Sequence, residues 1–338
     1  MKKFFQLSAT AFAVFLLLFY TSCSSNRLDV DISDIEVKLD IRHFEDDLFE
    51  NKLNDYPSFF KKYPYFLSDY TLGILNFPFN TAEEAFPQLM LYKTDVNVRG
   101  AYNEVKAKYA NFKPYEEELT TAYKYFKFHF PDQKIPSIIT YFSHFSFYMN
   151  VVGQDYIGIG LDMHMGENFK YYEYAGIEKY WRKNLIPQSI VTNHMLAHAN
   201  DLFLKTNRKK NFIDEMIYQG KLLYFLDATT PNVPDYIKIG MTQKEFEWCK
   251  AEEHNIWAFI VKEKYLYDTE AKNYERLINE GPKTIAPGVP PEAPAKIGKY
   301  VGWMAVRQYM NENSDVTLSE LMNDGNAEQI LQKSGYKP

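Results

Sequence analysis

The chain has 338 residues, of which 24% are charged and 17% are aromatic, and its formal net charge is −6. Because acidic residues outnumber lysine and arginine and both signs are mixed along the chain, the composition argues against a nucleic-acid partner. The length is enough for a sizeable hydrophobic core, arranged as one large domain or two.

The N-terminus has the features of a lipoprotein signal peptide, which we assign to residues 1–22. Lys2 and Lys3 precede a mostly apolar stretch that ends at Tyr20, and two small residues then lead to Cys23. A simple membrane anchor is the alternative, but the apolar run is short for a span. We therefore predict that the mature chain begins at an acylated Cys23, which holds it to a lipid bilayer.

The residues after Cys23 indicate where the anchored protein is sorted. Ser24 follows, and no aspartate stands there to retain the protein in the inner membrane, so sorting rules in other Gram-negative bacteria favour the cell outer membrane. No strong acidic export tag follows directly, which favours the periplasmic face. Residues 23–43 are predicted to form a lipidated tether.

Cysteine usage limits the cross-links available to the mature chain. With Cys23 acylated, Cys249 is the one thiol left, so no intramolecular disulfide is expected. We interpret Cys249 as a small packed residue of a helix rather than a nucleophile.

Residues 44–135 are predicted to form an N-terminal helical region. Aromatic residues are frequent from Phe44 to Phe79. Beyond them, apolar residues recur at three- and four-residue intervals in Glu83–Lys93, Val96–Tyr109 and Tyr115–Phe130. This spacing is typical of helices with one apolar face.

The pattern changes at Pro136, where a second region, residues 136–338, begins. Ile138–Phe142 and Phe147–Val152 each favour a strand, and Gly153–Asp155 favours a turn.

An alternation of large apolar and small or polar residues follows from Ile157 to Met165. Gly158, Gly160, Asp162 and His164 fall on one face of this segment. One interpretation is an edge strand beside a cleft, with His164 in the cleft. The alternative is a hairpin whose glycines permit close packing.

After Pro187 the sequence favours helices almost to its end. Residues 281–294 are the exception, because their prolines require an ordered loop or a linker. Thr317 begins a capping box that opens a last helix, which we expect to end near Gly335.

His194 and His198 form the most informative pattern in the chain. Their spacing places both imidazoles on one helical face, and Glu215 on the next helix would complete a zinc site with two nitrogens and one oxygen. Asp201 continues the same face. A metallopeptidase needs a general-base glutamate after the first histidine, but Met195 stands there and cannot accept a proton.

The pair also has an interpretation without metal. A histidine on an apolar helix is more often a hydrogen-bonded core residue than a ligand, so a vestigial site that binds nothing is an equal alternative. The order of strand, histidine helix and glutamate helix is the one found in zincin metallopeptidases, and this order favours a zincin-like layout.

Several stretches together resemble the gliding-motility lipoprotein GldB family of Bacteroidota, itself similar to zincin-like putative peptidases. The matching segments are the lipoprotein leader, Tyr156–Gly166, His194–Phe203, Phe212–Asp227, Trp248–Glu253, Ile256–Trp257, Tyr265–Tyr267, Ile297–Trp303, Val306–Met310 and Leu331–Pro338. The resemblance implies a lipid-anchored envelope protein that works with the gliding machinery, or with linked secretion machinery, and no established enzymatic activity. It also implies that the helix of Tyr300 and Arg307 returns towards the cleft, although an aromatic core position and a surface cation are the simpler interpretations.

The sequence thus predicts an α+β fold, predominantly helical, with a zincin-like metallopeptidase-type core and a small antiparallel or mixed sheet. We expect residues 44–135 and 136–338 to form one compact domain. This domain should bind an envelope protein partner and is not expected to be an enzyme. Zinc, held by His194, His198 and Glu215, is the one candidate cofactor. The alternative is a zinc-dependent hydrolase with a displaced general base, for which Asp201, Glu252 and Glu253 are candidates. A purely structural lipoprotein, with both histidines in the core, is the third interpretation.

Overall fold

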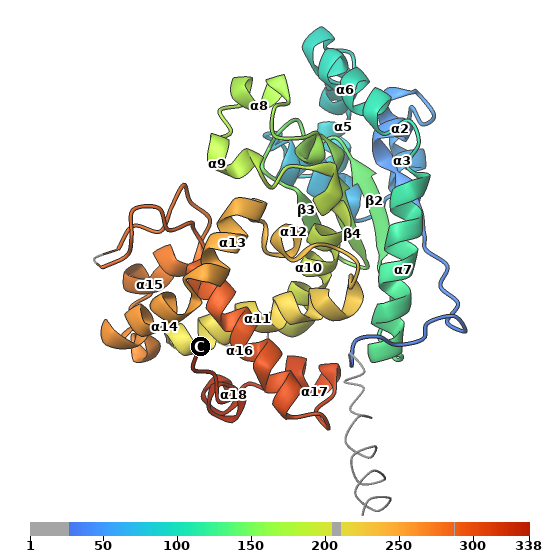
Figure 1. Cartoon of the computed structure of the whole chain (residues 1–338). Helices are drawn as coiled ribbons and strands as arrows, with labels where there is room; N and C mark the ends of the chain where they lie inside the picture. Colours follow the sequence, from blue (N-terminus) through green and yellow to red (C-terminus); the bar gives the residue numbers. More distant parts are fainter. Residues whose placement is uncertain (1–26, 205–210, 287) are drawn as a thin grey trace, which may run out of the picture. The chain divides into compact units, whose positions relative to one another are not determined.

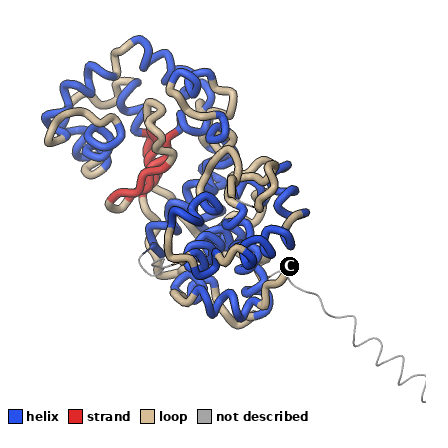
Figure 2. The backbone as a smooth tube through the Cα atoms, turned by 90° about the vertical axis from the view of Figure 1, so that its left-hand side faces the viewer, coloured by secondary structure: helices blue, strands red, loops and turns tan. Residues whose placement is uncertain are grey.

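The computed structural model describes residues 27–204, 211–286 and 288–338. The chain divides into two units, residues 1–31 and 32–338. The described part of the first, residues 27–31, contains no helix or strand. Cys23 and the signal peptide lie outside the described residues. Everything below concerns residues 32–338, in which helices surround a small sheet (Figures 1 and 2).

The N-terminal region is mostly helical. Its elements are β1 (Ile41–His43), α2 (Phe44–Phe49), α3 (Tyr56–Lys62), α4 (Phe66–Ser68), the π-helical turn η1 (Asp69–Ile74), α5 (Ala82–Tyr92), α6 (Val96–Lys108) and α7 (Lys113–His129). The three predicted helices correspond to α5, α6 and α7. Side-chain caps at Thr81 and Asp95 fix where α5 and α6 begin, because each accepts hydrogen bonds from backbone N–H groups of the first turn.

Four strands make a mixed sheet in the order β1-β2-β4-β3. The other three strands are β2 (Ser137–Tyr141), β3 (Asn150–Gly153) and β4 (Tyr156–Gly160). β1 and β4 both run parallel to β2, whereas β3 and β4 form an antiparallel hairpin. The small mixed sheet is therefore confirmed. β1 belongs to the sheet, so residues 41–43 are not part of a free tether.

The prediction of an edge strand beside a cleft is wrong for β4. This strand lies between β2 and β3, and all five of its residues are buried. A Cβ atom at Gly158 would lie 2.8 Å from Cε1 of Tyr141, and one at Gly160 would lie 2.6 Å from the carbonyl oxygen of Tyr148. The glycines therefore permit close packing, and the strand ends where Leu161–His164 form the 3₁₀ turn η2.

The rest of the chain is helical, with residues 281–286 and 288–294 free of helix and strand. The elements are α8 (Lys170–Tyr174), α9 (Lys179–Arg182), η3 (Pro187–Ser189), α10 (Ile190–Phe203), α11 (Phe212–Thr229), α12 (Asp235–Ile239), α13 (Gln243–Ala251), α14 (Glu253–Lys262), η5 (Tyr265–Tyr267), α15 (Ala271–Ile278), α16 (Ile297–Glu312), α17 (Leu318–Asn323) and α18 (Ala327–Ser334). The capping box at Thr317 is present, but the expected last helix is two helices. Asp324 ends α17, and the side chain of Asn326 caps α18.

Helix α11 forms the centre of the helical part and crosses α16 at close range. Most of its residues are buried. Gly220 on α11 and Gly302 on α16 meet at the crossing, where a Cβ on Gly302 would collide with the backbone of Met216. Two glycines thus set the distance between the two helices.

Candidate functional site

The two histidines of the predicted zinc site lie on the buried face of α10, which packs against α7. His194 is fully buried, and the side chain of His198 is 3% exposed. Nε2 of His194 lies 2.8 Å from the hydroxyl of Tyr123, and the ring of His198 lies 4.8 Å from the ring of Phe126. Residues of α7 therefore cover both imidazoles.

Burial also sets the protonation state of the pair. It lowers the pKa of His194 to about 3 and that of His198 to about 4, so both rings are neutral at neutral pH. Within the described part of the chain, Nδ1 of each ring has no hydrogen-bond partner. The two rings are thus core residues whose polar atoms are only partly satisfied.

The described residues do not bring the predicted ligands together as a metal site. Nowhere in 27–204, 211–286 and 288–338 do three His, Cys, Asp or Glu side chains form a group that could hold a metal ion. Glu215 is half-buried on α11 and accepts a hydrogen bond from Gln219, while Asp201 is exposed on α10. The Tyr123 hydroxyl occupies Nε2 of His194, and no third ligand side chain among the described residues joins the two rings, so these side chains, as placed, do not form a zinc site.

His164 does not line a cleft. It is fully buried in η2, where its Nδ1–H donates to the carbonyl of Gly160 and its Nε2 accepts from the side-chain amide of Asn193, at 2.9 and 3.2 Å. Burial lowers its pKa to about 4. His164 therefore joins the sheet to α10 as a neutral imidazole.

Tyr300 and Arg307 are structural residues of α16. The hydroxyls of Tyr300 and Tyr336 donate to the two carboxylate oxygens of Glu253, at 2.8 and 2.7 Å. Both carboxylate oxygens of Glu253, which the sequence suggested as a candidate general base, thus accept hydrogen bonds from tyrosines. Arg307 is not a simple surface cation, because its guanidinium makes paired hydrogen bonds to Asp227 and Asp235.

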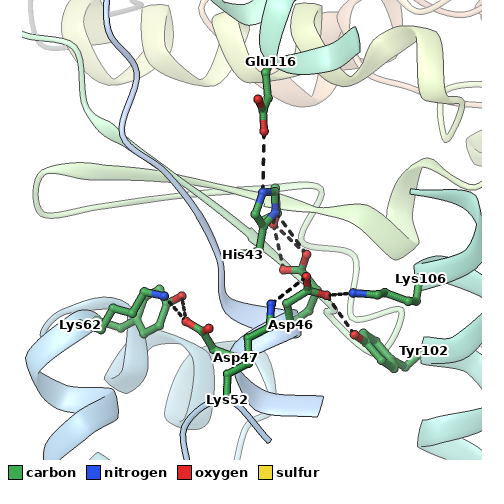
Figure 3. A network of polar contacts seen from close by, with 11 residues as sticks. His43, Asp46, Asp47, Lys52, Lys62, Tyr102, Lys106 and Glu116 are labelled. Carbon is green, nitrogen blue, oxygen red and sulfur yellow. Dashed lines mark hydrogen bonds and ion pairs between the residues drawn. The ribbon is translucent and has the colours of Figure 1, made fainter. Parts of the chain in front are cut away.

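The structure contains a polar cluster around His43 that the sequence did not predict (Figure 3). Nδ1 of His43 lies 2.8 Å from the hydroxyl of the fully buried Thr140, which donates to the carboxylate of Glu45 at 2.9 Å. Nε2 of His43 faces Glu116 on α7 at 3.8 Å. The carboxylate of Glu45, 3.6 Å from Nδ1, raises the pKa of His43 against the opposing effect of burial. Glu45 and Thr140 are far apart in sequence, so no motif announces the cluster.

Ion pairs extend this cluster along α2. Asp46 pairs with Lys106 and Lys52 and accepts a hydrogen bond from Tyr102, whose oxygen is 3.2 Å away. A cavity of about 170 Å³ adjoins it, lined by His43, Glu45, Asp46, Tyr102, Val105, Lys106, Tyr109, Ala110, Phe112, Glu116 and Leu161. Each of its three carboxylates, Glu45, Asp46 and Glu116, faces Lys106 or His43, so no charge on the wall lacks an opposite charge beside it.

The loop between β2 and β3 is strained. His144, Phe145 and Phe147 have φ angles of 56°, 59° and 63°, in the left-handed region that residues with side chains rarely adopt. Residues 147–149 are therefore not part of the predicted strand. As a result, the side chain of Phe147 is 56% exposed.

The fully buried carboxylate of Asp162 holds this loop in place. It accepts hydrogen bonds from the backbone N–H groups of Ser143 and Phe145, both at 2.7 Å, and from the Ser143 hydroxyl. Burial raises the pKa of Asp162 to about 6.

A larger groove of about 670 Å³ runs beside α7. Its lining is mostly apolar and comes from α7, from η3 and the start of α10, and from residues 229–237. The lining residues are Pro114, Glu117, Glu118, Thr121, Ala122, Tyr125, Gln188, Val191, Thr229, Thr230, Pro231, Asn232, Val233, Pro234, Tyr236 and Ile237. Its volume is within the range of roughly 300–1,000 Å³ seen for ligand pockets.

The chain matches one known protein family along most of its length. The model of the gliding motility protein GldB family matches residues 25–338. The chain belongs to the GldB family. No curated protein matches it, and no solved structure does.

GldB proteins are a lipoprotein family, which implies attachment to a membrane of the cell envelope through lipid. No helix of the described residues is long and apolar enough to cross a membrane. The GldB match confirms the family resemblance noted from the sequence, whereas the zincin-like part of that resemblance stays a prediction.

Proposed function

We propose that this GldB-family chain is a non-catalytic component of the cell envelope that supports gliding, or the secretion machinery associated with it, by binding a protein partner. It is anchored to the outer membrane through acylated Cys23 and faces the periplasm. In this proposal the histidine helix is the remnant of a peptidase-like layout and serves the core.

The burial of the histidine pair carries the proposal. Hydrolysis by a metal-bound water requires ligand nitrogens that open onto a cleft and a base that takes the proton. His194 instead contacts Tyr123, and His198 packs against Phe126. Met195, at the position of the missing base, is itself fully buried.

A complementation experiment tests the proposal. A double variant, His194→Gln with His198→Gln, is expressed in a host whose own copy of the gene is deleted. We expect colony spreading and secretion to remain near wild type, because neither imidazole takes part in chemistry. Cys23→Ala is the matched control and should lose function, because the variant cannot be acylated.

Zinc content provides the second measurement. The full chain, purified in detergent without chelator, should contain no zinc that depends on the two histidines. If zinc were bound at one ion per chain and lost in the double variant, and if that variant failed to complement at normal protein level, the zinc-dependent hydrolase would replace the present proposal.

A further inference from the structure

We propose that the groove beside α7 binds an extended segment of the envelope partner in which a lysine or arginine stands next to apolar side chains. This inference rests on the proposed function, because it names the surface through which a non-catalytic lipoprotein would act. The apolar lining of the groove and its negative charge both favour a polypeptide as the occupant.

The apolar lining favours a polypeptide segment with large apolar side chains. Ala122, Val191 and Ile237 are buried at the base of the groove. Tyr125 and Tyr236 add aromatic surface, and aromatic residues are frequent at the centre of protein interfaces. At about 670 Å³ the groove can receive several side chains of one segment.

The charge of the groove favours a lysine or arginine in the partner segment. Glu117 and Glu118 are the two charged residues among the described lining residues, so the wall is purely acidic. Glu117 has one cation near it, Lys113 at 3.7 Å, and both side chains are more than two-thirds exposed, which makes this pair weak. Glu118 makes no ion pair with any residue that the structure describes, and partial burial raises its pKa.

Two cations of the helical part, Lys238 and Arg307, are already paired with other carboxylates. Lys238, next to Ile237, pairs with Asp227 and Asp235, and Arg307 is held by the same two carboxylates. A cation supplied by the partner would therefore meet a Glu118 carboxylate that has no ion-pair partner among the described residues.

Peptide binding to the full chain in detergent micelles tests the inference. The probes are fluorescent octapeptides that combine large apolar residues with one lysine or arginine, each paired with a peptide in which glutamate replaces the cation. We expect the basic peptides to bind more tightly than their acidic counterparts in fluorescence anisotropy. Glu118→Lys should weaken their binding about tenfold or more.

Two further variants separate the groove from the rest of the surface. Thr121→Trp should abolish peptide binding, because Thr121 is an exposed lining residue and the indole would fill the groove. Glu275→Lys is the matched control, since Glu275 is an exposed glutamate on α15 outside the groove, and should bind as the wild type does.

Equal binding of basic and acidic peptides, or unchanged binding in Glu118→Lys, would overturn the inference. A dimer of the full chain that dissociates on Thr121→Trp would replace the partner segment by a second copy of the chain. The proposed function fails separately: histidine variants that abolish gliding but bind the peptides normally would refute the non-catalytic function and leave the groove in place.

Discussion

Burial lowers the pKa of His194 to about 3 and those of His164 and His198 to about 4, so their protonation is coupled to unfolding. The unfolded chain takes up protons below pH 6.5, near the ordinary histidine pKa, whereas the folded chain does not until near pH 4. Stability therefore falls as the pH drops through this window. Asp162 and His43 act in the opposite direction, because folding raises the pKa of both.

The contribution of one buried histidine can be isolated by substitution. Each buried histidine should lower the free energy of unfolding by about 2 kcal/mol when the pH falls from 7 to 5. We expect the loss of unfolding free energy between pH 7 and pH 5 to be smaller by about this amount in His194→Gln than in the wild type, measured by urea unfolding. His254→Gln, at an exposed position, should leave the loss unchanged. An equal loss in wild type and His194→Gln would show that the His194 ring is protonated inside the fold.

The spacing of His194 and His198 predicts correctly that they share one helical face, but it does not predict which residues cover that face. Spacing along a helix fixes the direction of a side chain, whereas Tyr123 and Phe126 come from a helix about seventy residues earlier. The His43 cluster was missed for the same reason, because Thr140 and Glu116 join it only through tertiary packing. Long-range partners of this kind leave no local pattern.

At the scale of elements, the crossing of α11 and α16 depends on glycine at both helices. Gly302→Ala should lower the free energy of unfolding by several kcal/mol, on the order of 3, because the new methyl group collides with the rigid backbone of Met216. Gly100→Ala on α6 is the matched control. Its methyl group would meet one atom, the Tyr171 hydroxyl at 3.7 Å, so it should be neutral or stabilising.

Chemical unfolding of the two alanine variants, followed by far-ultraviolet circular dichroism, checks this prediction. Equal midpoints for Gly302→Ala and wild type would mean that α16 can move away from α11 without cost.

Elements with a strong local signal were predicted well, and those set by packing were not. The periodicity of α5, α6 and α7 and the capping box of α17 are readable from neighbouring residues alone. The alternation in β4 was read as one buried and one open face, yet Tyr141 and the backbone of Tyr148 cover its glycine face. A glycine-lined face looks the same in sequence whether a cleft or another side chain lies against it.

The whole molecule contains a single cysteine beyond the predicted acylation site. Cys249 is fully buried in α13, and burial raises the pKa of its thiol to about 12. In the native chain this thiol should not react with a water-soluble disulfide reagent at neutral pH, because both access and thiolate are lacking. Labelling should require unfolding of the region around α13.

Thiol labelling with and without denaturant measures this directly. A Lys272→Cys variant supplies the control, because Lys272 is exposed and its thiol should react at once. Labelling of native Cys249 as fast as that control would show that α13 opens readily and that the packed core does not extend to it.

The edge strand β1 has a mechanical consequence for a protein held by a lipid. The chain enters the sheet at Asp40, whose carbonyl accepts the N–H of Ile138 and whose carboxylate accepts the Ser137 hydroxyl, both at 2.8 Å. Arg42 braces the same point through Asp40 and the carbonyl of Lys62. Within the sheet, tension from the N-terminal side therefore acts first on the short ladder of hydrogen bonds between β1 and β2, so this pair of strands is the part of the sheet that would separate first under load.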